Sequence, residues 1–295
     1  MASEFGFNSR SFNKVVRSGA WCRFRHGYYT FPDLWAAMSP ADQHRTRCRA
    51  VLHSLGPVVA LSHVSSLVMH GIDPWDQDLS RVHVTRLDGG AGRIEGDVVH
   101  HRSPISDDLL VDREGVLMTR PDRAALEAAS RRGGEAALCL LNQTLHAKLA
   151  DVDALWSAFK AMQSWPGMLG VHVPIRMADE RVASVGESRG FWLFRTHLIP
   201  APQPQFEVWV DGILIGTCDW GWPAHGLLGE FDGAIKYGRL LKPGMTAGDV
   251  VHAEKQREDA IREATDMRMM RLIWADFGRP RITARRVDGL LKRAA

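Results

Sequence analysis

Five side chains between residues 187 and 236 are of the types that phosphoryl-transfer chemistry uses. Four are acids and one is a lysine: Glu187, Asp219, Glu230, Asp232 and Lys236. Oxygen ligands of this kind suit Mg²⁺ or Mn²⁺ better than zinc. Such an ion activates a bound water as a nucleophile and stabilises the charge that develops on a phosphate. The residue types therefore predict a metal-dependent hydrolytic site, in which Lys236 would neutralise charge or position the water.

Three consecutive strands are expected to bring these acids together. The patterning predicts helices at 184–198 and 249–263 and strands at 206–210, 213–219, 227–232 and 268–274. The Asp211-Gly212 pair is a strong hairpin turn between the first two strands. Asp219 and Glu230 then lie near matched positions on neighbouring strands. Glu230 and Asp232, two residues apart, point to the same face.

Each acid also has a purely structural interpretation. Ser184 and Glu187 form the pattern of a capping box, and Asp219 is equally a polar residue at a strand end. Asp232 followed by Gly233 is an ordinary turn signal. Cys218 has no histidine placed to activate it, so we expect a small buried side chain rather than a nucleophile.

Charge is distributed unevenly along the chain, although the net charge is only +3. Residues 1–60 hold eight Lys and Arg against three acids, a net charge of +5, whereas residues 179–259 hold eight against twelve, a net charge of −4. A basic helix at 7–18 followed by a basic hairpin at 21–29 is the layout of a winged helix-turn-helix. The residues predicted to contact DNA are Arg10, Lys14, Arg17, Arg23 and Arg25. The alternative is a small solvated piece with a basic surface.

The middle of the chain contains four histidines that invite comparison with a metal site: His63, His83, His100 and His101. Their spacing matches no ligand motif, so structural histidines are the expectation. The patterning predicts helices at 41–56, 62–70, 122–131, 134–147 and 152–162, and strands at 82–85, 98–101 and 116–118. Residues 163–180 lack a clear period and are the expected linker.

Length and composition bound the remaining possibilities. The chain has 295 residues, of which 45% are hydrophobic and 24% charged, which favours two or three folded domains and excludes disorder. No apolar run is long enough for a transmembrane helix, and the N-terminus lacks a signal-peptide pattern, so no membrane partner is expected. The four cysteines lie far apart, which fits reduced thiols and a cytoplasmic location.

Several motifs resemble one large actinobacterial family, whose members join an AbiEi-like antitoxin winged helix to a domain related to very-short-patch-repair endonucleases. The motifs at the C-terminal end are the runs 186–189 (GESR), 218–220 (CDW), 229–239 (GEFDGAIKYGR), 249–251 (DVV), 254–259 (EKQRED) and 274–277 (WADF). The looser matches are 16–19 (VRSG), 21–29 (WCRFRHGYY) and 62–65 (SHVS). The resemblance covers most of the chain.

The resemblance implies an α+β or α/β protein in three parts. These are a winged-helix-like DNA-binding domain at 1–75, an AbiEi-like α/β domain at 76–165, and a PD-(D/E)XK endonuclease-like domain at 180–295, a mixed sheet flanked by helices. Glu187 would be the helix-borne acid, Asp219 the principal metal ligand and Glu230 the second ligand. Asp232 stands where the motif usually has lysine, and Lys236 would supply that charge from a migrated position.

Two functions follow as expectations. The first is a DNA endonuclease dependent on Mg²⁺ or Mn²⁺, in a toxin–antitoxin or phage-defence context, whose basic front docks on duplex DNA. The second is a non-catalytic regulator or antitoxin of AbiEi type, which keeps the nuclease fold as a scaffold or dimerisation surface and has a cognate toxin or a second copy as its partner. An RNA substrate remains open, because no RNA-reading motif argues either way.

Overall fold

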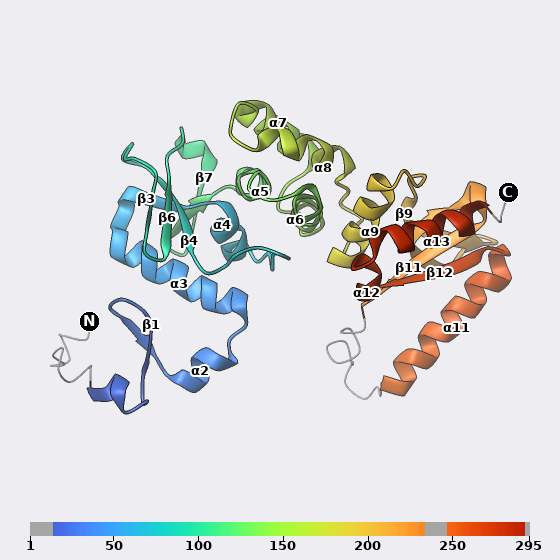
Figure 1. The fold of residues 1–295 in the computed structure, drawn as a ribbon, viewed down its shortest axis with the longest axis horizontal. Coiled ribbons are helices and arrows are strands. Elements are labelled where there is room, and N and C mark those ends of the chain that lie inside the picture. The colour runs from blue at the N-terminus through green and yellow to red at the C-terminus, as the bar shows by residue number, and fades with distance from the viewer. Residues whose placement is uncertain (1–13, 234–246, 293–295) are drawn as a thin grey trace. The chain divides into compact units, whose positions relative to one another are not determined.

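A computed structural model describes residues 14–233 and 247–292 and is of the mixed α+β class (Figure 1). The chain divides into two compact units, Met1–Ala128 and Ala129–Ala295, called here the N-terminal and C-terminal units. The expected domain ends at residues 75 and 165 both fall inside these units. The first falls there because strands from either side of residue 75 pair in one sheet.

The N-terminal unit is built on a six-stranded mixed sheet with the order β5-β6-β4-β3-β8-β7. Its strands are β3 (Val59–Leu61), β4 (Val82–Arg86), β5 (Arg93–Glu95), β6 (Val98–His101), β7 (Leu110–Arg113) and β8 (Val116–Thr119). Its helices are α2 (Pro32–Ala37), α3 (Pro40–Leu55), α4 (His63–Met69) and α5 (Pro121–Ala129), with short 3-10 turns at Gly56–Val58 and Asp107–Leu109.

One face of this sheet is apolar and packs on α3. Alternate residues of β4, Val82 and Val84, are fully buried there together with Cys48 and Val51 of α3. The helix begins cleanly because Ser39 caps it, its side chain accepting the Asp42 amide, and because Pro40 fits the first turn. Strand alternation therefore directs the intervening side chains of β4 to the opposite face.

A two-stranded hairpin precedes this sheet, formed by β1 (Cys22–Arg25) and β2 (Tyr28–Thr30) after a helical turn at residues 14–17. The hairpin expected at 21–29 is thus present, and Gly27 takes the left-handed conformation that its turn requires. Contacts from Tyr28 and Arg25 help to hold the hairpin against the rest of the unit. The Tyr28 hydroxyl lies 2.7 Å from His53 Nδ1, and Arg25 pairs with Asp97 at 3.0 Å.

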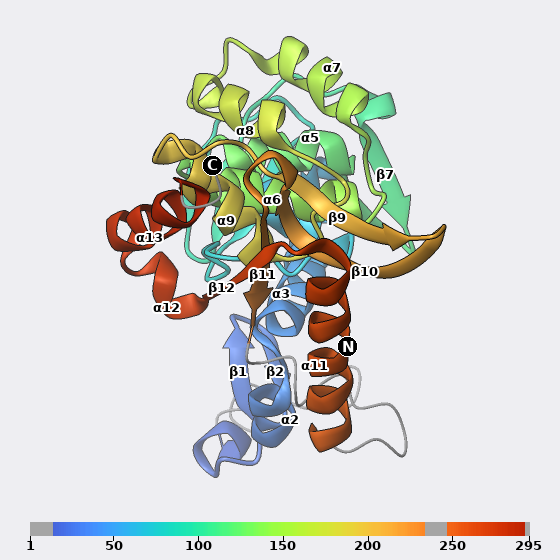
Figure 2. The same ribbon diagram turned by 90° about the vertical axis from the view of Figure 1, so that its right-hand side faces the viewer.

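The C-terminal unit contains a four-stranded sheet with the order β12-β11-β10-β9 (Figure 2). Its strands are β9 (Gln203–Val210), β10 (Ile213–Trp222), β11 (Leu227–Asp232) and β12 (Arg268–Ile273). Its helices are α6 (Gly134–His146), α7 (Val152–Met162), α8 (His172–Met177), α9 (Val185–Thr196), α11 (Ala247–Thr265), α12 (Trp274–Phe277) and α13 (Pro280–Lys292), with 3-10 turns at Met168–Val171 and Pro223–His225. The first three strands are antiparallel, and β12 joins β11 in parallel.

Helices cover both faces of this sheet. On one face, Trp220 of β10 packs between α9 and the strands, edge-on to Phe194 at a centroid distance of 5.3 Å. On the other face, Ile261 of α11 packs against Cys218 and Leu228. The polar side chains at one end of β10 and β11 therefore lie next to two well-packed apolar cores.

The prediction of a linker at 163–180 is wrong. Residues 168–177 form a 3-10 turn and α8, and Met168, Val171 and Ile175 are almost fully buried. The Pro and Gly residues obscure the helical period at the sequence level, but the apolar side chains between them join the core of the C-terminal unit.

Candidate functional site

Glu187 lies in the first turn of α9 and is 3% exposed. Ser184 caps this helix, accepting the Glu187 amide at 3.2 Å, while Glu187 Oε2 accepts the Ala183 amide at 3.1 Å. This is close to the reciprocal pattern of a capping box, so the carboxylate helps to start the helix. The same carboxylate also faces the sheet.

Gln205 of β9 connects Glu187 with Asp219. Its Nε2 lies 2.9 Å from Glu187 Oε2 and 3.4 Å from Asp219 Oδ1. The flanking register pairs, Phe206 with Cys218 and Pro204 with Trp220, put Gln205 opposite Asp219 across the β9–β10 ladder. Gln205 has a φ of +47°, which is unusual for a residue with a side chain and marks a constrained position. Sequence reasoning missed this residue.

Asp219 also replaces a strand contact between β10 and β11. The ladder runs from Trp222 opposite Leu227 to Trp220 opposite Gly229. Beyond that pair, the Phe231 amide donates to Asp219 Oδ2 at 2.7 Å, so a side chain serves as the acceptor. The carboxylate of Asp219 is therefore fixed at the point where the two strands stop pairing through their backbones.

Glu230 of β11 is 7% exposed and is paired with two arginines. The closest contact is from Arg257 of α11, whose Nη2 donates to Glu230 Oε1 at 2.6 Å, while Arg271 of β12 lies 3.6 Å away. Arg257 is held in place because its other nitrogen donates to the Thr217 carbonyl at 2.9 Å. Burial raises the pKa of Glu230, and the Arg257 guanidinium opposes that rise.

Asp232 shares Arg271 with two other acids. Its carboxylate lies 3.9 Å from Arg271 Nη1, and the same arginine donates to Glu258 Oε2 at 3.0 Å. Lys236, the fifth residue of the predicted set, lies outside the described residues. The predicted acids are thus collected at one end of the sheet, and arginines that the sequence prediction did not assign compensate the charge of Glu230 and Asp232.

This arrangement only partly resembles a ready-made cation site. Glu187 and Asp219 present oxygens to one shared amide, which is a donor set that suits a hard divalent ion. Glu230, expected as the second ligand, is bonded to Arg257 instead. In the described part of the chain, no three carboxylates place their oxygens within 4.8 Å of one another.

Cys218 is buried beside this site. Burial raises the pKa of its thiol to about 12, so the sulfur stays protonated near neutral pH. The structure therefore agrees with the expectation of a small buried side chain.

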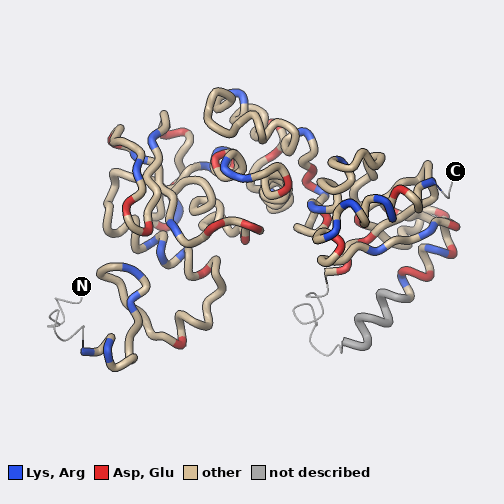
Figure 3. The backbone as a smooth tube through the Cα atoms, in the orientation of Figure 1, with Lys and Arg blue, Asp and Glu red and all other residues tan. Residues whose placement is uncertain are grey.

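The residues predicted to contact DNA are placed differently from one another. Lys14, Arg17 and Arg23 are exposed on the helical turn and the hairpin, where basic positions gather (Figure 3). Arg25 is instead held by Asp97 at 3.0 Å and by the Ser54 hydroxyl at 3.3 Å. It positions the hairpin, and its guanidinium is already engaged. Arg10 lies outside the described residues.

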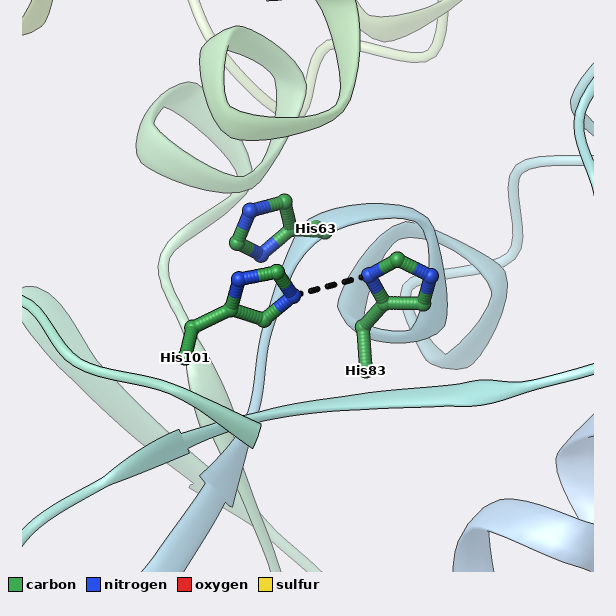
Figure 4. Close-up of side chains that lie close together, drawn as sticks. All are labelled: His63, His83 and His101. Atoms are coloured by element: carbon green, nitrogen blue, oxygen red, sulfur yellow. Dashed lines mark hydrogen bonds between the residues drawn. The ribbon is translucent and has the colours of Figure 1, made fainter. Parts of the chain in front are cut away.

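Three of the four histidines considered above converge in the N-terminal unit (Figure 4). The ligand nitrogens of His63, His83 and His101 all lie within 4.8 Å of one another, and His83 Nδ1 is 2.9 Å from His101 Nε2. His100 points to the other face of its strand and is 3% exposed, and burial lowers its pKa. The spacing along the sequence concealed this cluster, because its members come from a helix start and two parallel strands.

Comparisons of this chain with protein-family models, with curated proteins and with solved structures find no match. No helix in the described part of the chain is both long enough and apolar enough to span a lipid bilayer. The functional interpretation therefore depends on the geometry of the sites.

Proposed function

We propose that the C-terminal unit is a PD-(D/E)XK-type DNA endonuclease that depends on Mg²⁺ or Mn²⁺. The observation that carries this proposal is the position of Asp219. Asp219 Oδ1 shares the Gln205 side-chain amide with the helix-borne Glu187. Asp219 Oδ2 accepts the backbone amide of Phe231, the residue next to Glu230 on β11. Three acids from one helix and two strands thus lie near the point where β10 and β11 stop pairing.

The order of elements supports the same proposal. A helix, three antiparallel strands, a second helix and a parallel fourth strand follow one another as α9, β9, β10, β11, α11 and β12. A mixed sheet flanked by helices is consistent with the fold that the sequence resemblance implies.

The donor chemistry fits a hard divalent cation at Asp219. The Gln205 Nε2 lies between two carboxylates and presents to both of them the partial positive charge that a cation would present. On this proposal, Asp219 holds the ion with Glu187 and Glu230 beside it. When bound, the ion supplies an activated water and a positive charge for the phosphate.

Arg257 takes the place of the motif lysine in this proposal, because Asp232 occupies the usual lysine position. A guanidinium stays protonated at any physiological pH, so Arg257 cannot accept a proton, but it stabilises negative charge on a phosphate oxygen. Its contact with Glu230 at 2.6 Å keeps this positive charge next to the acids. Lys236 remains a second candidate for this role.

The test is a cleavage assay with supercoiled, linear and single-stranded DNA, and with RNA, in Mg²⁺ or Mn²⁺. Asp219→Asn is the sharpest variant, since the amide keeps an acceptor for the Phe231 amide while losing the charge that holds a cation. Glu207→Gln is the matched control, because Glu207 is an exposed acid on β9. We expect cleavage by the wild type and the control, and background levels with Asp219→Asn. Intact nucleic acid throughout, or equal cleavage by Asp219→Asn, would overturn the proposal.

One observation favours the alternative of a non-catalytic DNA-binding regulator. Gln205, Arg257 and Arg271 compensate the acids, so the set is stable without a metal ion. On this alternative the unit is a scaffold or dimerisation surface for a toxin or a second copy. It predicts that Asp219→Asn binds duplex DNA as the wild type does. Replacing Lys14 or Arg17 by a neutral residue should reduce the slope of log K for DNA binding against log salt concentration by about one for each residue.

A further inference from the structure

We propose that His63, His83 and His101 form a binding site for one borderline divalent ion of the zinc class, in the N-terminal unit. The site uses nitrogen donors only, whereas the acids of the C-terminal unit offer oxygen. Imidazole suits zinc and its neighbours in the first transition row, and carboxylate suits magnesium and manganese. The proposal is therefore independent of the nuclease proposal.

The sheet register brings two of the ligands together. In the parallel pair of β4 and β6, Thr85 is opposite His101 and His83 is opposite Val99. His83 and His101 thus share the sheet face that lies opposite the apolar core. Their facing nitrogens are 2.9 Å apart.

His63 completes the trio from the start of α4. Its φ of +54° is a left-handed conformation, uncommon for a histidine, and its ring lies over that of His101 with a centroid distance of 3.7 Å. Two nitrogens bound to one tetrahedral zinc at Zn–N distances of about 2.0–2.1 Å are separated by roughly 3.3 Å. The separations in this cluster are 2.9 Å for one pair and at most 4.8 Å for the others. Because the lone pair of an imidazole nitrogen lies in the ring plane, the stacked His63 ring must turn about its broad χ2 torsion to point at the same ion as His101.

A buried carboxylate supports His63 from behind, as metal-binding histidines require. His63 Nδ1 lies 3.0 Å from the Ser62 hydroxyl and 3.6 Å from Glu127 Oε2, which also accepts the His63 amide at 3.1 Å. Arg123 fixes the carboxylate by donating to Glu127 Oε1 at 2.8 Å. Outer-shell groups of this kind orient the rings of metal-binding histidines and raise their basicity.

The close packing of the three rings favours their neutral form, which is the form that can bind an ion. His83 and His101 lie with ring planes 20° apart and centroids 5.1 Å apart. Three imidazolium ions at such distances would repel one another strongly, whereas neutral imidazole is the form that binds metals. The hydroxyl of Thr85, next to His101 in the register, is buried and has no hydrogen-bond partner in the described part of the chain. On this proposal, the hydroxyl hydrogen-bonds to a water that completes the ion's ligand set.

The test measures zinc binding by the full, tag-free chain after treatment with a chelator. We expect one Zn²⁺ per chain by isothermal titration calorimetry, and a visible spectrum typical of four-coordinate Co²⁺ when cobalt replaces zinc. Loss of a supporting residue such as Glu127 weakens metal binding by about 10- to 100-fold. His83→Ala and His101→Ala each remove a ligand, so each should weaken zinc binding by a larger factor. His146→Ala, which removes an exposed histidine of the C-terminal unit, should bind zinc like the wild type.

Two further measurements keep the outcome unambiguous. Circular dichroism and thermal unfolding of each metal-free variant show whether it is folded, and only folded variants count. Asp219→Asn should bind zinc with unchanged affinity, which separates this site from the acids. The proposal is overturned if the wild type binds no zinc, or if folded His83→Ala and His101→Ala bind it as tightly as the wild type.

Discussion

Replacing Gly190 by alanine tests the packing that holds Glu187 against the sheet. Gly190 lies on α9 three residues after Glu187 and faces Trp220. A Cβ atom at this position would lie 2.2 Å from Cζ2 of the Trp220 ring, where ordinary contacts begin at 3.4 Å. The ring is fully buried and packs edge-on against Phe194, so moving it would displace neighbouring core side chains.

The expected magnitude follows from two opposing effects. Alanine favours a helix interior over glycine by about 1 kcal/mol. Overpacking a well-filled core costs about 1–3 kcal/mol. The overlap with Trp220 exceeds 1 Å, so we take the upper end of that range. Gly190→Ala should therefore lower the free energy of unfolding by about 2 kcal/mol.

Urea denaturation followed by circular dichroism measures this change, and the chain offers a matched control. Gly289 is also a helical glycine, in α13, but a Cβ there would meet no atom within 4 Å. Gly289→Ala should raise the free energy of unfolding by about 0.5–1 kcal/mol. If Gly190→Ala stabilised the protein as Gly289→Ala does, the packing of α9 on Trp220 described here would be wrong.

Three further predictions concern buried ionisable groups. Arg123→Met should lower the free energy of unfolding by about 3–5 kcal/mol, because it leaves the Glu127 carboxylate buried without its cation. Urea denaturation measures this change, and a decrease of less than about 1 kcal/mol would contradict the prediction. Burial lowers the pKa of His44, so its contribution to stability is complete above the unperturbed pKa of 6.5 and is lost as the pH falls through the folded value. Urea denaturation midpoints measured above and below pH 6.5 should reveal this loss of stability in the wild type but not in His44→Gln. Burial raises the pKa of Glu230, so stability should fall as the pH rises from the unperturbed value of 4.5 through the folded value. That fall should disappear in Glu230→Gln, and an unchanged pH profile would exclude Glu230 as its source.

Much of the local structure could be predicted from the sequence. The helix expected at 152–162 has those bounds in the structure, and the strand expected at 227–232 does too. Both segments have strong patterns and clear start signals, such as Asp151, whose side chain accepts the Ala154 amide at the start of α7. Local signals of this kind depend only on neighbouring residues, so a single sequence contains them.

The candidate sites could be predicted only in part, because they depend on contacts between distant segments. The alternation of residues predicts that His100 and His101 face opposite sides of their strand. It does not predict that β4 and β6 pair in parallel, which is what joins His83 with His101. Gln205 follows a run of prolines that is typical of a loop, and its role appears only when β9 pairs with β10. The arginine partners of Glu230 lie on α11 and β12, which are distant from Glu230 in the sequence and contact it only in the folded sheet.

The bond between the Phe231 amide and the Asp219 carboxylate has an evolutionary consequence. Because the carboxylate completes a strand contact, selection for a folded protein favours Asp219 whether or not the residue takes part in catalysis. Asp232 is under weaker structural constraint, since its ion pair with Arg271 is 3.9 Å long. Among relatives selected for the fold alone, Asp232 should therefore vary before Asp219, which persists as a component of the sheet.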